Sequence, residues 1–386
     1  MKILYYTHQY FLDSDLPLIR ELRNMGHEVY LFFEIVPYLL KSTVLSIEKQ
    51  IDRTGIFPIS AYKEMDKFDS YVDKEKSFVL NRPGKIYGLQ NILMRIQFRK
   101  IVKTINPDII YSTDFIDIAD RFLYRYQDKI VQMVHDPFPH IGEVTRRKLI
   151  NRKYAFKKIK SFVLLNEAQV KQFSEQFHIP MKYIHTNKLG YYDCMSLYKP
   201  DNFIPIPYEK RNTILFWGRI SPYKGIEYLL EAMLQVHEIA PEAQLVIAGA
   251  GNYYFDISKY QRLNFIKFIP HFIEMEDLYQ LLSKSKVVVC PYIEATQSGV
   301  IMTSFAMNVP VVVTNVGGLP EMIDCGAGNI VPAKDVNEMS RAIASFFTEK
   351  DKCEQMASII EQKKQSGDSA WNTIAKKYLA IFEKSL

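Results

Sequence analysis

Short apolar runs alternate along the chain with segments whose apolar residues recur at helical spacing. Residues 2–7 (KILYYT) predict a strand, residues 16–25 predict a helix, and residues 26–33 (GHEVYLFF) predict a second strand. A strand, a helix and a strand in this order form the βαβ unit of a parallel sheet. The alternation resumes after residue 212 with TILFWG, IEYLLEAMLQVHEI, QLVIAG, FIKFIP, MEDLYQLLSKS, KVVVCPY, VIMTSFAM and PVVVTNV. Such continuous apolar strands favour a sheet that helices cover on both faces.

Residues 199–211 (KPDNFIPIPYEKR) interrupt this alternation with three prolines and no periodicity, which is typical of a linker. A chain of 386 residues is long enough for two domains, each with its own core. We therefore expect an α/β protein with one parallel-sheet domain at 1–200 and a second one at 201–366. A final helix is expected at 367–386, where the apolar residues fall on one helical face.

The composition narrows the function classes. The net charge of +6 is small for a chain of this length, and it is compatible with anionic substrates or lipid headgroups. The sequence contains no zinc-finger, RNP or basic-zipper pattern, so nothing in it indicates a nucleic-acid partner. The four cysteines are widely separated and form no C-x-x-C pair, so we expect no metal site and a reducing compartment. The N-terminus enters a strand directly, and no apolar run approaches the roughly 20 residues that span a bilayer. A cytoplasmic location is expected, with peripheral contact to the inner face of the membrane as an open alternative.

The stretch Ile214–Gly225, ILFWGRISPYKG, joins an apolar run to a helix-like segment through Gly218. A strand that ends in a glycine turn before a helix presents backbone N–H groups and a positive dipole end to an anion. Arg219 and Lys224 add two positive charges in the same turn. Because Arg binds phosphate oxygens bidentately and Lys acts as a point charge, the stretch predicts a phosphate site. The alternative is that both residues merely flank a surface turn.

A second glycine turn before a helix, QSGVIMTSFAM, begins at Gln297, and two such turns in one cleft would suit a diphosphate. Both turns belong to a series of four motifs, GRISPYKG, VIAGAG, PYIEATQSG and NVPVVVTNVGGLPE. The series resembles the retaining glycosyltransferases of family 4, densely over about residues 211–347 and more loosely before them. The resemblance implies the GT-B fold, in which two Rossmann-like domains face a cleft and the last helix crosses back to the first domain.

By the same resemblance, catalytic roles fall on four residues, and the donor needs no cofactor or metal. Arg219 and Lys224 would stabilise the charge on the leaving diphosphate, and Glu294 matches, within one residue, an acid that faces the donor sugar. Thr303 replaces a second acid that usually holds the ribose; its hydroxyl can still bond to ribose, and an ordinary helix residue is the alternative. The expected donor-binding residues are Gly218, Gly249, Gln297, Ser298, Gly299, Val300 and Thr303.

The fourth catalytic candidate is His135, which ends the predicted strand in VQMVHDPFPH at 131–140. Ligands of an open parallel sheet bind at the carboxyl ends of its strands, where a His can bond to a sugar hydroxyl or to the reacting centre. The segment is similar to the family's H-D-x-x-P-H stretch, which implies that His135 lies in the active-site cleft. A capping or core histidine is the alternative, and His140 fits a cap of the next helix.

Three further patterns have weaker functional meaning. Asp13-Ser14-Asp15 is a D-x-D, which holds a metal in another glycosyltransferase fold, but its place before a helix predicts ordinary capping. The loop THQYFLDSDLP lacks the glycines of the family's acceptor loop. The region from Ile86 to Lys103 predicts a packed helix with a solvated basic face, or alternatively a surface that contacts anionic lipid headgroups.

These expectations combine into a retaining hexosyltransferase that uses a nucleotide diphosphate sugar, with UDP favoured as the nucleotide. The acceptor would be a glycan or a lipid-linked sugar in the assembly of surface polysaccharide. One rival is a catalytically weak scaffold that binds nucleotide sugars, motivated by Thr303 and the glycine-free loop. A second rival is an NAD-dependent enzyme, although Gly249 and Gly251 form only an incomplete dinucleotide fingerprint.

Overall fold

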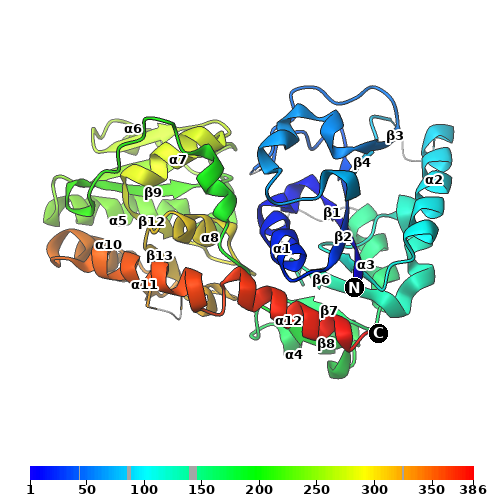
Figure 1. Cartoon of the computed structure of the whole chain (residues 1–386). Coiled ribbons are helices and arrows are strands. Elements are labelled where there is room, and N and C mark those ends of the chain that lie inside the picture. The colour runs from blue at the N-terminus through cyan, green and yellow to red at the C-terminus, as the bar shows by residue number, and fades with distance from the viewer. Residues whose placement is uncertain (43, 85–87, 139–145, 324–325) are drawn as a thin grey trace. The chain divides into compact units, whose positions relative to one another are not determined.

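The computed structural model describes residues 1–42, 44–84, 88–138, 146–323 and 326–386. Contacts between residues divide the chain into two compact units (Figure 1). Unit 1 comprises Met1–Leu189 and Trp371–Leu386, and unit 2 comprises Gly190–Ala370. Each unit contains a largely or wholly parallel sheet covered by helices, so the expected α/β class with two sheet domains is confirmed.

The boundary between the units falls after Leu189 and not after residue 200, because the segment that follows Leu189 packs on unit 2. The backbone N–H of Tyr192 donates to the carbonyl of Met302 at 3.4 Å. A 3-10 segment, η7 (Asp193–Tyr198), then contacts two helices of unit 2. The prolines of 199–211 therefore mark an irregular stretch inside unit 2, and the chain changes unit before it reaches them.

Unit 1 is built on a sheet whose described strands have the order β3-β4-β2-β1-β5-β6-β7-β8. Every neighbouring pair is parallel except β3 and β4, which are antiparallel. Ile3 of the central strand lies opposite Val29 and Ile109 on its two sides, and all three are buried. The strands are β1 (Lys2–His8), β2 (Glu28–Ile35), β3 (Gly55–Pro58), β4 (Ser77–Asn81), β5 (Ile109–Ser112), β6 (Ile130–Val134), β7 (Phe162–Leu164) and β8 (Ile184–Thr186).

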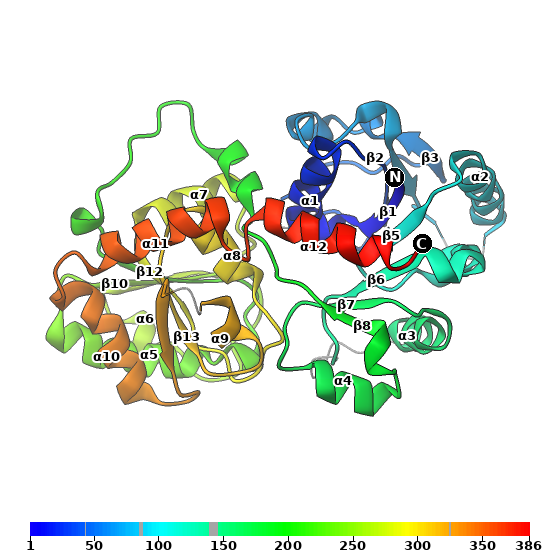
Figure 2. The same cartoon turned by 60° about the horizontal axis from the view of Figure 1, so that its bottom comes forward.

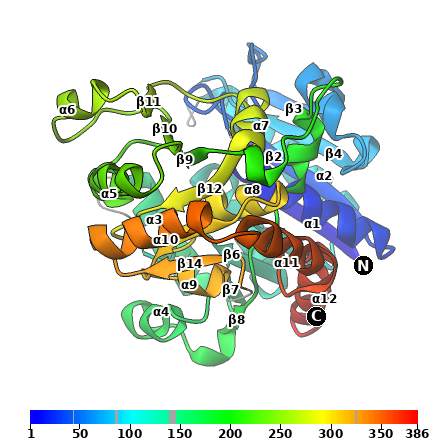
Figure 3. The same ribbon diagram turned by 90° about the vertical axis from the view of Figure 1, so that its left-hand side faces the viewer.

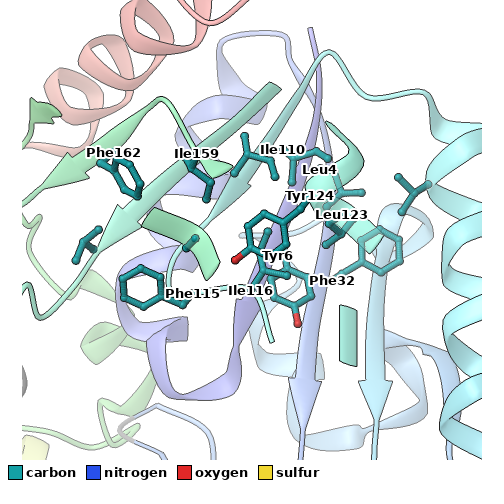
Figure 4. Packing of buried hydrophobic residues seen from close by; sticks show 14 of the residues in the cluster. Leu4, Tyr6, Phe32, Ile110, Phe115, Ile116, Leu123, Tyr124, Ile159 and Phe162 are labelled. Carbon is teal, nitrogen blue, oxygen red and sulfur yellow. The ribbon is translucent and has the colours of Figure 1, made fainter. Parts of the chain in front are cut away.

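Helices flank this sheet, and the principal core of unit 1 lies between the sheet and the helical layer that includes α2 and α3. Figure 4 shows part of this core, where Tyr6, Phe32 and Ile110 from the strands meet Leu123 of a 3-10 segment. Burying side chains of this size gains about 1.5–3 kcal/mol each. The helical segments are η1 (Gln9–Phe11), α1 (Leu12–Asn24), α2 (Leu89–Ile105), η5 (Ile118–Lys129), α3 (Arg146–Lys158), α4 (Val170–Phe177) and α12 (Trp371–Glu383).

The last helix, α12, belongs to unit 1 although unit 2 precedes it in the chain. The Tyr378 ring packs edge-on against Tyr111 of β5, with centroids 5.0 Å apart. The side-chain amide of Asn187 donates to the backbone carbonyl of Ile374 at 3.1 Å. The apolar stripe recognised in the sequence is thus the face that packs on unit 1, beside α1.

Unit 2 contains a parallel sheet with the order β11-β10-β9-β12-β13-β14. The order reverses between β9 and β12, and ligands of such sheets bind at the carboxyl edge of this switch point. Helices α5 and α10 pack together on one face, and α7 and α8 lie on the other (Figures 2 and 3). The strands are β9 (Thr213–Trp217), β10 (Gln244–Ala248), β11 (Ile266–Ile269), β12 (Ser285–Cys290), β13 (Val311–Thr314) and β14 (Gly328–Val331). The helices are α5 (Ile226–Ile239), α6 (Ser258–Gln261), α7 (Met275–Lys284), α8 (Gly299–Ala306), α9 (Leu319–Met322), α10 (Val336–Thr348) and α11 (Lys352–Ser366).

Within the described residues, no helix combines the length and the apolar character that crossing a bilayer requires.

Candidate functional site

The turn after β9 contains Gly218 and Arg219, the first two residues of the predicted phosphate site. Gly218 has a φ of +122°, and its N–H donates to the carbonyl of Ala248 at 2.9 Å. The N–H of Ile220 donates to the carbonyl of Ala250, also at 2.9 Å. Arg219 lies between these two bonds with an exposed side chain. The backbone of the turn is therefore fixed against the turn after β10.

Glycines allow the neighbouring turns to approach more closely than any other residue would permit. A Cβ at Gly249 would lie 1.8 Å from the carbonyl oxygen of Gly218, and one at Gly225 would lie 2.1 Å from the carbonyl oxygen of Pro291. Both positions also have positive φ, +155° and +62°. Gly225 directly precedes α5, so its contact joins the start of that helix to the turn after β12. The glycines of GRISPYKG and VIAGAG thus assemble one edge of the sheet.

The turn after β12 leads into α8, whose N-cap is Ser298. A Cβ at Gly317 would lie 1.6 Å from the carbonyl oxygen of Ala295, so the turn after β13 also packs directly on this one. A Cβ at Gly218 would lie 3.9 Å from Cγ2 of Val300, which puts the first turn of α8 beside the turn after β9. The positive end of the α8 dipole therefore lies at the switch point.

Tyr292 links Lys224 to the start of α8. The Lys224 ammonium lies 3.7 Å from the centroid of the Tyr292 ring, a cation–π contact with a side chain that is 1% exposed. The Tyr292 hydroxyl lies 3.3 Å from the hydroxyl of Ser298. Lys224 is thus held near the N-terminus of α8, and two positive features share one edge of unit 2. The sequence analysis missed Tyr292, whose only signal was an aromatic residue beside Pro291.

The remaining donor-site candidates occupy different surroundings. Glu294 is exposed and Gln297 is half-buried, both in the turn between β12 and α8. Thr303 is 1% exposed, and its hydroxyl donates to the carbonyl of Gly299 at 2.8 Å within α8. A ribose contact by Thr303 therefore requires its hydroxyl to leave this bond, and it stays a prediction. The structure thus brings five candidates to one edge of the unit 2 sheet: Gly218, Lys224, Gly249, Ser298 and Val300. The side chain of Thr303, in contrast, is buried and bonded to the backbone of its own helix.

His135 directly follows β6 in unit 1, at the carboxyl end of that strand. Its ring centroid is 5.0 Å from that of Phe11, and its Nδ1 is 3.8 Å from Oδ1 of Asp136. Burial lowers the pKa of His135, but the negative charges of Asp136, Asp13 and Asp114 together outweigh burial and raise it. A higher pKa favours the doubly protonated ring, which donates from both nitrogens. His140 lies outside the described residues.

A buried ionic network, which the sequence pattern did not reveal, occupies the same carboxyl edge of unit 1. Arg82 is 1% exposed; its Nε lies 2.7 Å from Glu34, and its Nη2 lies 2.5 Å from Asp120. Nδ1 of His8 lies 3.2 Å from Glu34, whose hydrogen bond and charge outweigh burial and raise the pKa of His8. The hydroxyl of Tyr6 donates to Asp120 at 2.8 Å. The members come from separate strands and loops, so no local motif could identify them.

The capping role expected for Asp13-Ser14-Asp15 is wrong for Asp15. The helix α1 already begins at Leu12, so the motif lies inside its first turn. The carboxylate of Asp15 accepts hydrogen bonds from the hydroxyls of Tyr5 at 2.7 Å, Thr7 at 2.5 Å and Thr113 at 2.7 Å. Burial raises the pKa of Asp15 to about 7, against the lowering effect of these bonds. Asp15 therefore has a structural role, as a buried hydrogen-bond acceptor in the core of unit 1.

Comparisons with known proteins agree with this geometry. Residues 211–349 match the family described as Glycosyl transferases group 1. Alpha-D-kanosaminyltransferase of Streptomyces kanamyceticus is 23% identical over 62% of this chain and 62% of its own. An uncharacterized glycosyltransferase of Methanocaldococcus jannaschii is 37% identical over 28% of this chain and 29% of its own. A GDP-mannose-dependent monoacylated alpha-(1-6)-phosphatidylinositol monomannoside mannosyltransferase of Corynebacterium glutamicum is 29% identical over 34% of this chain and 36% of its own. The matches span less than two thirds of each relative.

Solved structures resemble the whole chain. A glycosyltransferase of Rickettsia africae ESF-5 has 17% identity and a TM-score of 0.65, with 100% of this chain and 98% of that one covered. HepE of Anabaena in complex with UDP has 16% identity and a TM-score of 0.63 over 98% and 100%. UDP-GlcNAc 2-epimerase of Neisseria meningitidis, bound to UDP-GlcNAc, has 13% identity and a TM-score of 0.58 over 100% of both chains. The chain therefore has the two-domain fold of GT-B glycosyltransferases, and its residues 211–349 match the family described as Glycosyl transferases group 1.

Proposed function

We propose that this chain is a metal-independent hexosyltransferase that takes a sugar from a nucleotide diphosphate donor, UDP in the first instance, and retains its anomeric configuration. The acceptor is a glycan or a lipid-linked sugar in the assembly of surface polysaccharide. The observation that carries the proposal is the ammonium of Lys224 held beside the N-terminus of α8 through Tyr292. A cation and a helix N-terminus at one switch point suit a dianionic diphosphate better than a neutral ligand.

In this mechanism the bond between the anomeric carbon and the diphosphate oxygen breaks, and the electron pair leaves with the diphosphate. Lys224, Arg219 and the N–H groups of Gly299 and Val300 stabilise the charge that develops there. The acceptor hydroxyl attacks from the face that the diphosphate leaves, and its proton passes to the departing phosphate oxygen. Atoms and charge balance without an added base, and the new bond has the configuration of the old one.

The other candidate residues have supporting roles. Glu294 is exposed in the turn before α8 and faces the donor sugar in this proposal. His135 contributes a hydrogen bond to a sugar hydroxyl, and its raised pKa keeps a donor proton available. Gln297 and Ser298 bind donor oxygens from the turn that leads into α8.

Several findings support this reading over the scaffold alternative. The matched relatives include transferases named for kanosaminyl and mannosyl transfer, and a structural neighbour holds UDP. Because one relative is named as GDP-mannose-dependent, the donors tested below include GDP-sugars as well as UDP-sugars. The fold by itself does not choose the reaction, because a UDP-GlcNAc 2-epimerase shares it.

The test incubates the full chain with UDP- and GDP-sugars, with and without a panel of glycan and lipid-linked acceptors, and analyses products by mass spectrometry and NMR. Acceptor-dependent release of nucleoside diphosphate with a glycoside of retained configuration is the expected result. A nucleotide sugar that binds but is not consumed with any acceptor would favour the scaffold. Inversion at C2 of an intact UDP-sugar would favour an epimerase.

A further inference from the structure

Two helices of unit 1 concentrate positive charge to an unusual degree. In sequence, α2 (Leu89–Ile105) and α3 (Arg146–Lys158) carry 11 of the 49 basic residues and none of the 43 acidic ones. One of the 11, Arg152 of α3, is half-buried and donates to the backbone carbonyl of Asp136, so it does not contribute to the outer surface. The net charge of the whole chain is only +6, so the rest of the chain is net negative. Both helices pack against η5, which adds the exposed residues Arg121 and Arg125. We call this surface, formed by α2, η5 and α3, the basic face.

The inner side of α2 explains how the helix is held. Met94, Phe98 and Val102 recur at helical spacing, are 2% exposed or less, and pack into the core of unit 1. Asn91 is also buried and accepts a hydrogen bond from Arg82 at 3.1 Å. The helix is therefore anchored through this side, and its opposite side is presented outward.

The outer side of α2 begins with apolar residues. Leu89, Ile92, Leu93 and Ile96 are spaced as one helical stripe and are 71%, 40%, 57% and 49% exposed. Single exposed aliphatic residues need no explanation, but a continuous stripe does. Leu149 and Ile150 of α3 are likewise 48% and 50% exposed. Together these side chains are six of the ten large apolar residues that are exposed on the described part of unit 1.

The same stripe of α2 continues as positive charge. Arg99, Lys100 and Lys103 follow Ile96 by three, four and seven residues, and Arg95 lies beside them. All four are exposed, and among the described residues none has a carboxylate within 4.0 Å. Exposed aliphatic side chains next to a cluster of cations supply the two contributions by which proteins bind an anionic membrane surface, apolar burial and attraction to charged headgroups.

We propose that the basic face binds the surface of a bilayer that contains anionic lipids, with the stripe Leu89–Ile96 inserted among the headgroups and the cations of α2 at the phosphates. Charge complementarity selects anionic headgroups, and the aliphatic stripe selects a bilayer over a nucleic acid, which binds through phosphate contacts and aromatic stacking. The proposal goes beyond the donor chemistry, since it concerns where the protein works. It provides a reason for a lipid-linked acceptor to be within reach.

The test measures sedimentation of the full chain with vesicles of equal phosphatidylglycerol and phosphatidylcholine, and with pure phosphatidylcholine vesicles. The charge variant replaces Arg95, Arg99, Lys100 and Lys103 with Gln. Its matched control replaces four exposed basic residues of unit 2 with Gln, an equal change in net charge: Arg262, Lys267, Lys334 and Lys350. A third protein, Leu89→Gln/Leu93→Gln/Ile96→Gln, removes the apolar stripe. Circular dichroism and UDP binding verify that each variant is folded.

We expect the unmodified chain to sediment with the anionic vesicles, and to do so more weakly at 300 mM than at 50 mM salt. With the zwitterionic vesicles, the chain should stay in the supernatant. Each lost charge weakens binding about fivefold, so the charge variant binds more than a hundredfold more weakly, whereas its control is unchanged. The apolar variant loses binding chiefly at the higher salt. Equal binding by the charge variant and its control would overturn the proposal, as would binding to RNA without binding to vesicles. UDP-sugar turnover is measured separately, so a failure here is distinct from a failure of the donor site.

Discussion

At the scale of single residues, the proposed donor site depends on where the ammonium group of Lys224 is held. Lys224 has four flexible side-chain carbons, but its ammonium lies 3.7 Å above a buried ring whose hydroxyl neighbours the N-cap of α8. A cation held in advance of binding loses less freedom when the diphosphate arrives. Arg219 differs from Lys224 in its surroundings, because its side chain is exposed.

We predict that Lys224→Ala and Arg219→Ala each reduce turnover about a hundredfold, because each removes one charge from the leaving diphosphate. The measurement is kcat and KM for the donor identified above. The exposed residues Lys267 and Arg262 of unit 2 provide matched controls, and their Ala variants should turn over normally. Near-normal turnover in both site variants would remove the leaving-group role from this turn.

The glycines of the site test the backbone geometry independently of charge. Gly249→Ala places a methyl group 1.8 Å from the carbonyl oxygen of Gly218, so the two turns must separate. We predict a lower unfolding midpoint for unit 2 and loss of UDP binding by calorimetry. Gly326→Ala is the control, since it has a φ of +77° but only Ile359 within 4 Å, at 3.9 Å. If both variants bound UDP equally well, close packing of these turns would not matter for the donor.

Sequence alone predicted which turns meet at this edge of unit 2, because glycines and basic residues at strand ends have local signatures. Gly218, Lys224, Gly249 and Val300 come together as expected. Tyr292 could not be predicted, because only the fold puts its ring beneath the ammonium of Lys224. The ionic network around Arg82 was missed for the same reason: its partners lie on different strands and loops.

At the scale of elements, periodicity predicted much of the order of strands and helices, but it missed β3, β4, β14 and α3 and did not give each boundary. The helix expected at 16–25 begins earlier, at Leu12, because Asp15 is held inside its first turn by hydroxyls of β1 and of the loop after β5. The unit boundary was expected at the prolines, but η7 already packs on unit 2. Tertiary contacts determine both the start of α1 and the unit boundary, and a local sequence pattern carries no information about such contacts.

Asp15 gives unit 1 a predictable pH dependence. Its pKa of about 7 in the folded protein exceeds the value of about 4 expected for an unfolded chain, so the native state binds more protons between these values. This group therefore makes the free energy of unfolding fall as pH rises from about 4 to 7, by about 1.4 kcal/mol per pH unit at the steepest. Asp15→Asn should remove that slope.

The measurement is denaturant unfolding at several pH values in a Trp217→Phe background, where the remaining tryptophan, Trp371, reports unit 1. The exposed Asp128, paired on the surface with Lys160, provides the control variant Asp128→Asn, which should keep the slope. A slope of the same size in the Asp15 variant would assign the pH dependence to other groups.

At the scale of the whole molecule, the chain starts and ends in the same unit. The C-terminal helix α12 completes unit 1 with Tyr378, which is 2% exposed and packs on Tyr111 and Phe382. This arrangement was expected only through the resemblance to the GT-B family, since the apolar stripe of α12 does not itself indicate which surface it covers. Stability of the first unit therefore depends on the last residues of the chain.

We predict that Tyr378→Ala destabilises unit 1 by about 3–5 kcal/mol, the usual cost of truncating a large buried aromatic side chain. Hydrogen exchange should accelerate in β1 and β5 and stay unchanged in β9 and β12. Lys376→Ala, at an exposed position of the same helix, should change neither unit. Equal acceleration in both units would mean that they unfold together.

The central claim is that unit 2 grips the donor diphosphate with a lysine, an arginine and the N-terminus of α8. A crystal structure with an intact UDP-sugar bound tests this claim most directly. The account predicts diphosphate oxygens within hydrogen-bonding distance of the Lys224 ammonium, the Arg219 guanidinium and the backbone N–H of Val300. A donor bound elsewhere, with the Lys224 and Arg219 side chains directed into solvent, would contradict it.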